Sequence, residues 1–155
     1  MTHLTRYSFG ATSAIVTSLA FIVSLSGNPE SRGAIIGTLL VFAVADNVSD
    51  SLGIHIFQES DLKGAGTVAA STISNFFTRL IIISTFVIVV YLMPTELAVY
   101  VSVAFGVTLL TVLSYLIAVE RGSSTLSSVA THLIVTALVI AGSYVLRLWI
   151  SDLFG

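Results

Sequence analysis

Five long apolar segments, separated by short polar breaks, dominate this chain and restrict what it can fold into. Each segment is long enough to cross a bilayer as a helix, for which about 20 residues suffice. We therefore expect an all-α, polytopic integral membrane protein, a single transmembrane domain over residues 1–155 in contact with the lipid bilayer. The expected helices cover about residues 9–25, 33–57, 67–93, 97–119 and 125–150.

The composition agrees with a membrane location, because 55% of the 155 residues are hydrophobic and only 9% are charged. In a soluble bundle of this composition, apolar residues would lie on every face of every helix. The chain contains no cysteine, which excludes disulfides, thiolate metal sites and cysteine nucleophiles. The net charge of -2 provides no basic patch, so no nucleic-acid partner is expected.

The few basic residues indicate how the chain is oriented. Cytoplasmic loops of membrane proteins carry an excess of lysine and arginine. With five spans, three basic residues fall on the side of the N-terminus and two on the other, namely Arg6, Lys63 and Arg121 against Arg32 and Arg147. This distribution predicts that the N-terminus is cytoplasmic.

The second segment contains two carboxylates, Asp46 and Asp50, together with Asn47 and Ser49, well inside an apolar stretch. Burying an ionisable group at the centre of a membrane helix costs roughly 2.5 kcal/mol or more, so such residues need partners, protons or a cation. Residues four apart lie about 40° apart around a helix, so the two carboxylates share one face. Two adjacent acids repel unless one is protonated or a cation lies between them, which predicts proton coupling or divalent-cation binding.

A purely structural role for these acids is the alternative, with Arg79 from the third helix as the partner of an ion pair. The apolar residues after Arg79 extend only ~21 Å before Pro94, at ~1.5 Å per residue. This length predicts that Arg79 is shallowly buried and extends its side chain to the cytoplasmic interface. Pairing with Asp50 or Glu59, or a role in gating, is the second possibility.

His132 lies on the fifth helix in a ridge of polar residues at helical spacing, formed with Thr125, Ser128, Thr136 and Ser143. Histidine exchanges protons near neutral pH, so His132 is a candidate for proton relay. The alternative is a neutral histidine that forms a hydrogen bond with a neighbouring helix.

Several stretches resemble one known family. Phe9-Gly10 occurs where that family has Asp-Gly, and residues 49–55 occur where it has Ser-Met-x-x-Gly-Glu-Tyr. Glu59-Ser60-Asp61 follows with the family's polar spacing, and residues 115–122 and 141–145 look like the ends of its fourth and fifth helices. On these motifs the chain resembles the vacuolar iron transporter family of divalent iron and manganese exporters.

The differences from this family fall at its metal ligands. Phe9 replaces an aspartate, Phe42 a glutamate and Asp50 a methionine. Asp46 and Asp50 would restore carboxylates at new positions and give a harder, all-oxygen site. The resemblance thus implies that the metal is bound by Asp46, Asn47, Ser49 and Asp50. Glu59 and Asp61 would be the remnant of the family's acidic extension. Proton coupling or gating would be the role of Asp50, Arg79 and His132.

The resemblance implies a homodimer that moves a divalent metal ion, iron or manganese, out of the cytoplasm in exchange for protons. The metal is the substrate, and neither a bound cofactor nor enzymatic activity is expected. An intramembrane aspartyl protease normally needs aspartates on two facing helices, whereas Asp46 and Asp50 are on one. The alternative function is a non-transporting membrane scaffold or regulator. Short loops and small size favour a prokaryotic cell membrane, and the resemblance leaves a vacuolar membrane open.

Overall fold

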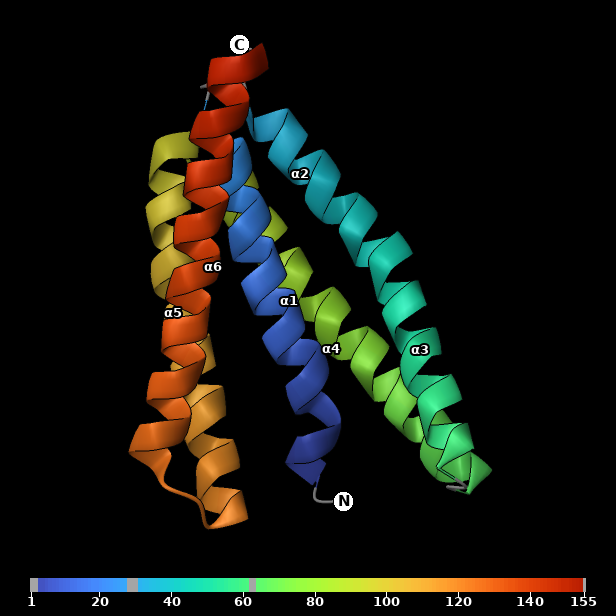
Figure 1. Ribbon diagram of the computed structural model, residues 1–155. Coiled ribbons are helices and arrows are strands. Elements are labelled where there is room, and N and C mark those ends of the chain that lie inside the picture. Colours follow the sequence, from blue (N-terminus) through green and yellow to red (C-terminus); the bar gives the residue numbers. More distant parts are fainter. Residues whose placement is uncertain (1–2, 28–30, 62–63, 155) are drawn as a thin grey trace.

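The computed structural model describes residues 3–27, 31–61 and 64–154, all of them in helices or the turns that join helices. The elements are α1 (His3–Leu25), α2 (Arg32–Val41), the π-helical η2 (Phe42–Asp46), α3 (Asn47–Ser60), α4 (Ala65–Leu92), α5 (Thr95–Arg121) and α6 (Thr125–Phe154) (Figure 1). Because α2, η2 and α3 follow one another without a break, they form one long helix. Within the described residues, five helices are long and apolar enough to cross a membrane, which confirms the predicted all-α fold.

The helices extend beyond the predicted bounds at several ends. α1 begins at His3, α4 begins at Ala65 and α6 continues to Phe154. The predictions followed the apolar side chains, whereas backbone hydrogen bonds continue a helix through polar residues at its ends. Lys63, one of the basic residues used above to orient the chain, lies outside the described residues.

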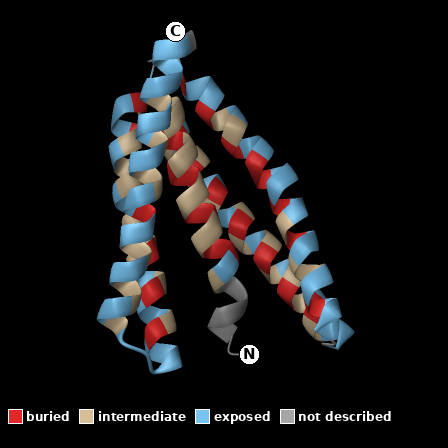
Figure 2. Ribbon diagram, viewed as in Figure 1, coloured by how far each residue is buried: buried red, intermediate tan, exposed pale blue. Residues whose placement is uncertain are grey.

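Helix α1 lies at the centre of the bundle, between the α5–α6 pair and the pair formed by α4 and the long α2–η2–α3 helix (Figure 1). The chain begins at one end of the bundle and finishes at the other, as an odd number of spans requires. Buried residues follow the inner faces of α1 and α4, while Thr136 is the one buried residue in the described part of α6 (Figure 2). The exposed residues of α6 are mainly apolar, which suits contact with lipid tails.

Two connections have clear causes in the sequence. Pro94 directly precedes α5, and its missing N–H costs nothing at a helix start. Gly122 ends α5 with a φ of 63°, a left-handed conformation that glycine adopts without strain.

The close approach of α1 to α4 depends on Gly10. A Cβ atom at this position would collide with the side-chain oxygen of Asn75 and lie 3.1 Å from Cγ of Arg79. Both neighbours are almost completely buried, so neither side chain has room to move away. The glycine therefore sets the distance between the two helices.

We expect Gly10→Ala to lower the midpoint of thermal unfolding in detergent, because overpacking costs about 1–3 kcal/mol. Gly142→Ala on α6 is the matched control, since no atom lies within 4 Å of a Cβ there. An equal midpoint for the two variants would contradict the close α1–α4 packing.

Candidate functional site

The two predicted carboxylates lie where the long second helix changes its winding. Asp46 is the last residue of η2, and Asp50 lies in the first turn of α3. At ~1.5 Å per residue, Asp46 is ~21 Å and Asp50 ~15 Å from the end of α3, close to the middle of a ~30 Å hydrocarbon layer. π-helical turns are rare and often occur at functional sites.

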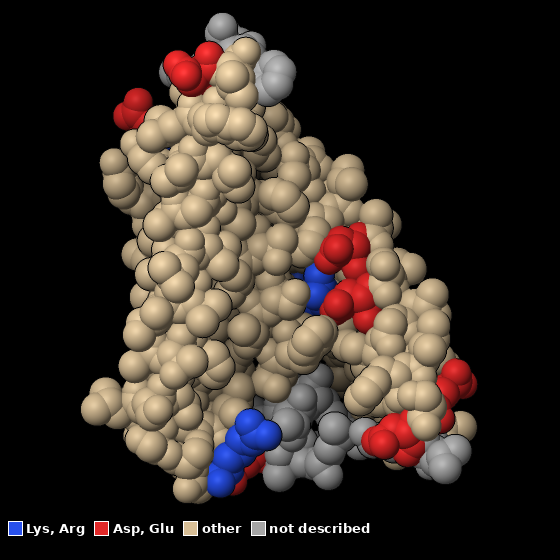
Figure 3. Space-filling model, in the orientation of Figure 1, with Lys and Arg blue, Asp and Glu red and all other residues tan. Residues whose placement is uncertain are grey.

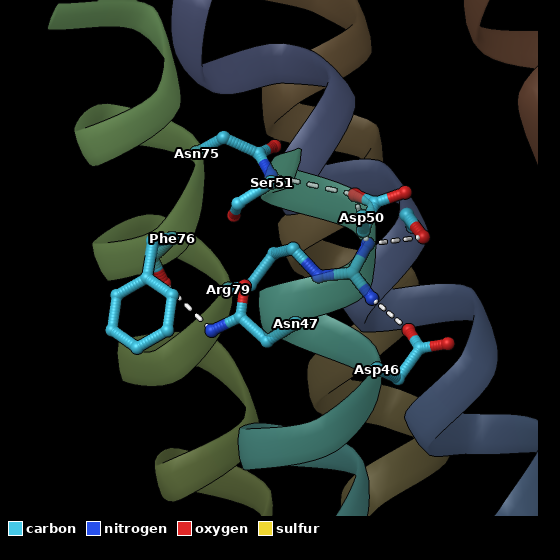
Figure 4. A network of polar contacts seen from close by, with 8 residues as sticks. Asp46, Asn47, Asp50, Ser51, Asn75, Phe76 and Arg79 are labelled. Carbon is cyan, nitrogen blue, oxygen red and sulfur yellow. Dashed lines mark hydrogen bonds and ion pairs between the residues drawn. The ribbon is translucent and has the colours of Figure 1, made fainter. Parts of the chain in front are cut away.

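Arg79 binds both carboxylates (Figure 4). Its Nη2 lies 2.5 Å from Oδ2 of Asp46, and its Nη1 lies 2.7 Å from Oδ2 of Asp50. Nη1 also donates a hydrogen bond to Oγ of Ser13 on α1, at 2.8 Å. One guanidinium thus joins α1, η2 and α3 to α4.

The predicted shallow position of Arg79 is wrong. The side chain is only 1% exposed, and it points at the acids of the neighbouring helix instead of extending to the interface. The prediction measured the apolar length in one direction only, from Arg79 to Pro94. Because α4 begins at Ala65 and ends at Leu92, Arg79 lies at the middle of the helix.

Other side chains complete the surroundings of the ion pairs. The ring of Phe42 lies over the guanidinium, with its centroid 5.3 Å from Cζ of Arg79, a distance typical of cation–π contacts. Asn75 donates hydrogen bonds to Oδ2 of Asp50 at 3.4 Å and to Oγ of Ser51 at 3.2 Å. An aromatic ring therefore packs on the arginine at the position where the family resemblance suggested a lost glutamate.

The cluster carries more acid than base. Two carboxyl groups face one guanidinium, which leaves one acidic group in excess among the described residues of the site. The side chain of Asp46 is 52% exposed and that of Asp50 is 26% exposed. Figure 3 shows acidic atoms gathered around a recessed basic group in a hollow on one face, away from the charges at the helix ends. One proton or one cation would neutralise this excess.

The remaining predicted metal ligands do not join the two aspartates. Ser49 is exposed on α3. Glu59 lies at the end of α3, where its carboxylate is 3.4 Å from Nε2 of His55, and Asp61 follows directly after α3. The described part of the chain contains no group of three or more histidine, cysteine, aspartate or glutamate residues placed to hold a metal ion.

Asn47, also predicted as a metal ligand, is completely buried and donates a hydrogen bond to the backbone oxygen of Phe76 on α4. Its side chain thus bonds to the backbone of α4 rather than to the guanidinium (Figure 4). A single chain provides two aspartates for a cation, and both are bound to Arg79.

His132 lies apart from this cluster, in the α5–α6 pair. Its Nδ1 is 2.8 Å from Oγ of Ser114, a buried residue of α5. The hydrogen bond to a neighbouring helix, one of the two alternatives for His132, is present. The proton-relay role stays a prediction.

Sequence reasoning missed three residues of the site, Ser13, Ser51 and Asn75. A usable signal existed for two of them, because Asn75 precedes Arg79 by one helical turn and Ser51 follows Asn47 by one turn. Polar residues that recur on one face of an apolar helix mark a buried polar surface.

Comparison of this chain with protein families, with curated proteins and with solved structures finds no match. The geometry of the site and the motif resemblance are therefore the basis on which a function is inferred.

The ion pairs make a specific prediction about stability. Asp46→Asn or Asp50→Asn alone leaves Arg79 with one carboxylate, whereas the double variant leaves a buried guanidinium without any. Since an uncompensated buried charge costs about 3–5 kcal/mol, the double variant should lose far more stability than the two single variants combined.

Thermal unfolding in detergent measures this difference. The double variant Glu96→Gln with Asp152→Asn, which changes exposed acids near helix ends, serves as the control and should show additive effects. Additive losses at Asp46 and Asp50 would mean that Arg79 does not couple the two carboxylates.

Proposed function

We propose that this chain is a membrane transporter that moves a divalent metal cation out of the cytoplasm in exchange for protons. The observation that supports this proposal most directly is the mid-membrane cluster of Asp46, Asp50 and Arg79 with its single excess acidic group. Ionisable residues at this depth are costly, and in membrane proteins they commonly serve ion pathways and proton relays. The proposal includes a cytoplasmic N-terminus.

In the proposed cycle, Arg79 acts as a resident cation that competes with the substrate. A divalent cation that enters the hollow binds the carboxylates of Asp46 and Asp50 and displaces the guanidinium from at least one of them. Protonation of a carboxylate then weakens its hold on the metal, which leaves on the other side. Exchange follows because metal and protons compete for the same oxygens.

The chemistry of the ligands bears on which cation fits. Carboxylate, amide and hydroxyl oxygens are hard ligands, and such ligands suit manganese better than they suit softer metals. Methionine and cysteine are absent from the site. Of the two expected substrates, we therefore propose manganese as the better one.

A second copy of the chain would complete the site. The exposed carboxylate of Asp46 lies at a depth where lipid tails would otherwise cover it, which is unfavourable for a charged group. A two-fold dimer through this face would place two Asp46–Asp50 pairs near one axis and provide four carboxylates. The proposed homodimer thus accounts for both the exposed acid and the small number of ligands in one chain.

One observation favours a different function, that of a membrane scaffold or regulator without transport. Arg79 links α1, η2 and α3 to α4 through ordinary ion pairs and a hydrogen bond, which are sufficient to fix helix packing. Under this alternative, the cluster stabilises the bundle and no ion crosses it.

Uptake of Mn²⁺ and Fe²⁺ into proteoliposomes, with and without a pH gradient, separates the two functions. We expect metal flux in the wild type that depends on the gradient, and a loss of at least tenfold in Asp50→Asn, because the shared oxygen site is gone. Asp152→Asn makes the same chemical change outside the site and should leave the flux unchanged.

The Asp50→Asn variant is suitable for this flux measurement because Arg79 keeps Asp46 as a partner, so the bundle should remain folded. Absence of flux for both ions in the wild type would favour the scaffold. Normal flux in a well-inserted Asp50→Asn variant would rule out the proposed site.

A further inference from the structure

A groove lies on the surface of the bundle where α6 packs against α1 and α5. It is lined by Val23 of α1, by two valines of α5 and by one face of α6 between Leu133 and Tyr144. On that face Ala137 and Ala141 have small side chains and are exposed, so the groove is open to the surroundings of the bundle. Its volume of about 550 Å³ falls within the range of about 300–1,000 Å³ that is typical of small-molecule sites.

The lining of the groove is apolar. Among the lining residues only Thr136 and Tyr144 carry a hydroxyl group, and all the others have aliphatic side chains. The hydroxyl of Thr136 already donates a hydrogen bond to the carbonyl oxygen of His132, at 2.8 Å. Because an ordered water needs two or more polar partners, hydrocarbon suits this groove better than water does.

The length of the groove matches one acyl chain of a bilayer lipid. The α6 residues that line it, from Leu133 to Tyr144, rise ~16 Å along the helix at ~1.5 Å per residue. Two acyl chains end to end make up a hydrocarbon layer of ~30 Å, so one chain extends over ~15 Å. A single chain can therefore occupy most of the groove.

A basic residue lies at the end of the groove that is nearer the C-terminus. Arg147 follows Tyr144 by one turn of α6, and its Cζ lies 4.7 Å from the centroid of the Tyr144 ring. Its Nη1 donates a hydrogen bond to Oγ of Ser26, at 3.2 Å, and Ser26 follows Val23 of α1 by one turn. The guanidinium therefore lies between the two helices, one turn beyond the residues that line this end of the groove.

The described part of the chain does not balance the charge of Arg147. Ser26 accepts from one of the five N–H groups of the guanidinium, and no carboxylate among the described residues forms an ion pair with it. Asp152, the next acid on α6, is exposed and lies more than one turn farther out. Nearby Trp149 is 58% exposed, and tryptophan in membrane proteins gathers at the level of the lipid headgroups. Arginine binds phosphate through parallel hydrogen bonds, so a lipid phosphate at this level suits the remaining donors.

We propose that the groove binds an anionic phospholipid, with one acyl chain between α1, α5 and α6 and the phosphate on the guanidinium of Arg147. An anionic headgroup is favoured over a choline headgroup, because choline carries its own cation and competes with the arginine for the phosphate. The bound lipid holds α6 against α1, where few side chains of α6 are buried. This site lies on the other side of α1 from the ion pairs of Arg79, so it goes beyond the proposed transport.

Native mass spectrometry of the full chain measures which lipid each chain retains. The protein is purified in detergent with equal amounts of phosphatidylglycerol and phosphatidylcholine that have identical acyl chains. We expect an about fivefold preference for phosphatidylglycerol, which is the size expected of one arginine beside an anionic headgroup. Equal retention of the two lipids by the wild type would overturn the inference.

Arg147→Gln tests the headgroup contact. This variant keeps the groove and should retain phosphatidylglycerol only as well as phosphatidylcholine, because the cation is gone. Arg121→Gln is the matched control, since Arg121 is an exposed arginine in the last turn of α5 and does not line the groove. It should keep the preference of the wild type.

Ala141→Leu tests the groove itself. The larger side chain displaces about two methylene groups of the acyl chain, so we expect retention of both lipids to fall about tenfold. Ala130→Leu makes the same change at an exposed alanine of α6 that does not line the groove, and it should have no effect. Size-exclusion profiles check that the variants are folded. Wild-type retention in a folded Arg147→Gln or Ala141→Leu variant would overturn the inference.

Discussion

The guanidinium of Arg79, held at mid-membrane by two carboxylates, is the interaction on which the rest of this structure depends. Helices in lipid gain little from burying apolar side chains against one another, so close packing and polar bonds decide which helices meet. Arg79 bonds to residues of α1 and of the long α2–η2–α3 helix and so fixes two helices against α4. Gly10 permits that arrangement, because a larger residue would press on Asn75 and Arg79.

The sequence was sufficient to predict the number of spans and the shared face of Asp46 and Asp50, since both follow from helical periodicity and apolar length. It was not sufficient to place Arg79. A pattern along one helix does not reveal which helix lies beside it. The predicted helix, residues 67–93, was already centred near Arg79, but its depth was taken from the distance to Pro94 alone.

The site also shows the limits of reasoning from motifs. Ser49, Glu59 and Asp61 were grouped with the aspartates by sequence spacing, but the helix turns Ser49 outward and carries the other two to its end. Phe42 appeared to be a lost ligand and instead packs on the arginine. Ser13 was overlooked because a single hydroxyl in an apolar helix is ordinarily a packing residue, and only the fold brings it to the cluster.

The π-helical turn at Phe42–Asp46 has a mechanical consequence. A π turn accommodates one residue more than an α turn, and one residue corresponds to about 100° of rotation. Conversion of these five residues to regular α-helix would therefore rotate the whole of α3 about its axis relative to α2. Such a rotation would turn Asn47, Ser51 and Asp50 away from α4 and bring Val48 and Leu52 inward. The winding of one short segment thus determines whether polar or apolar side chains of α3 face α4.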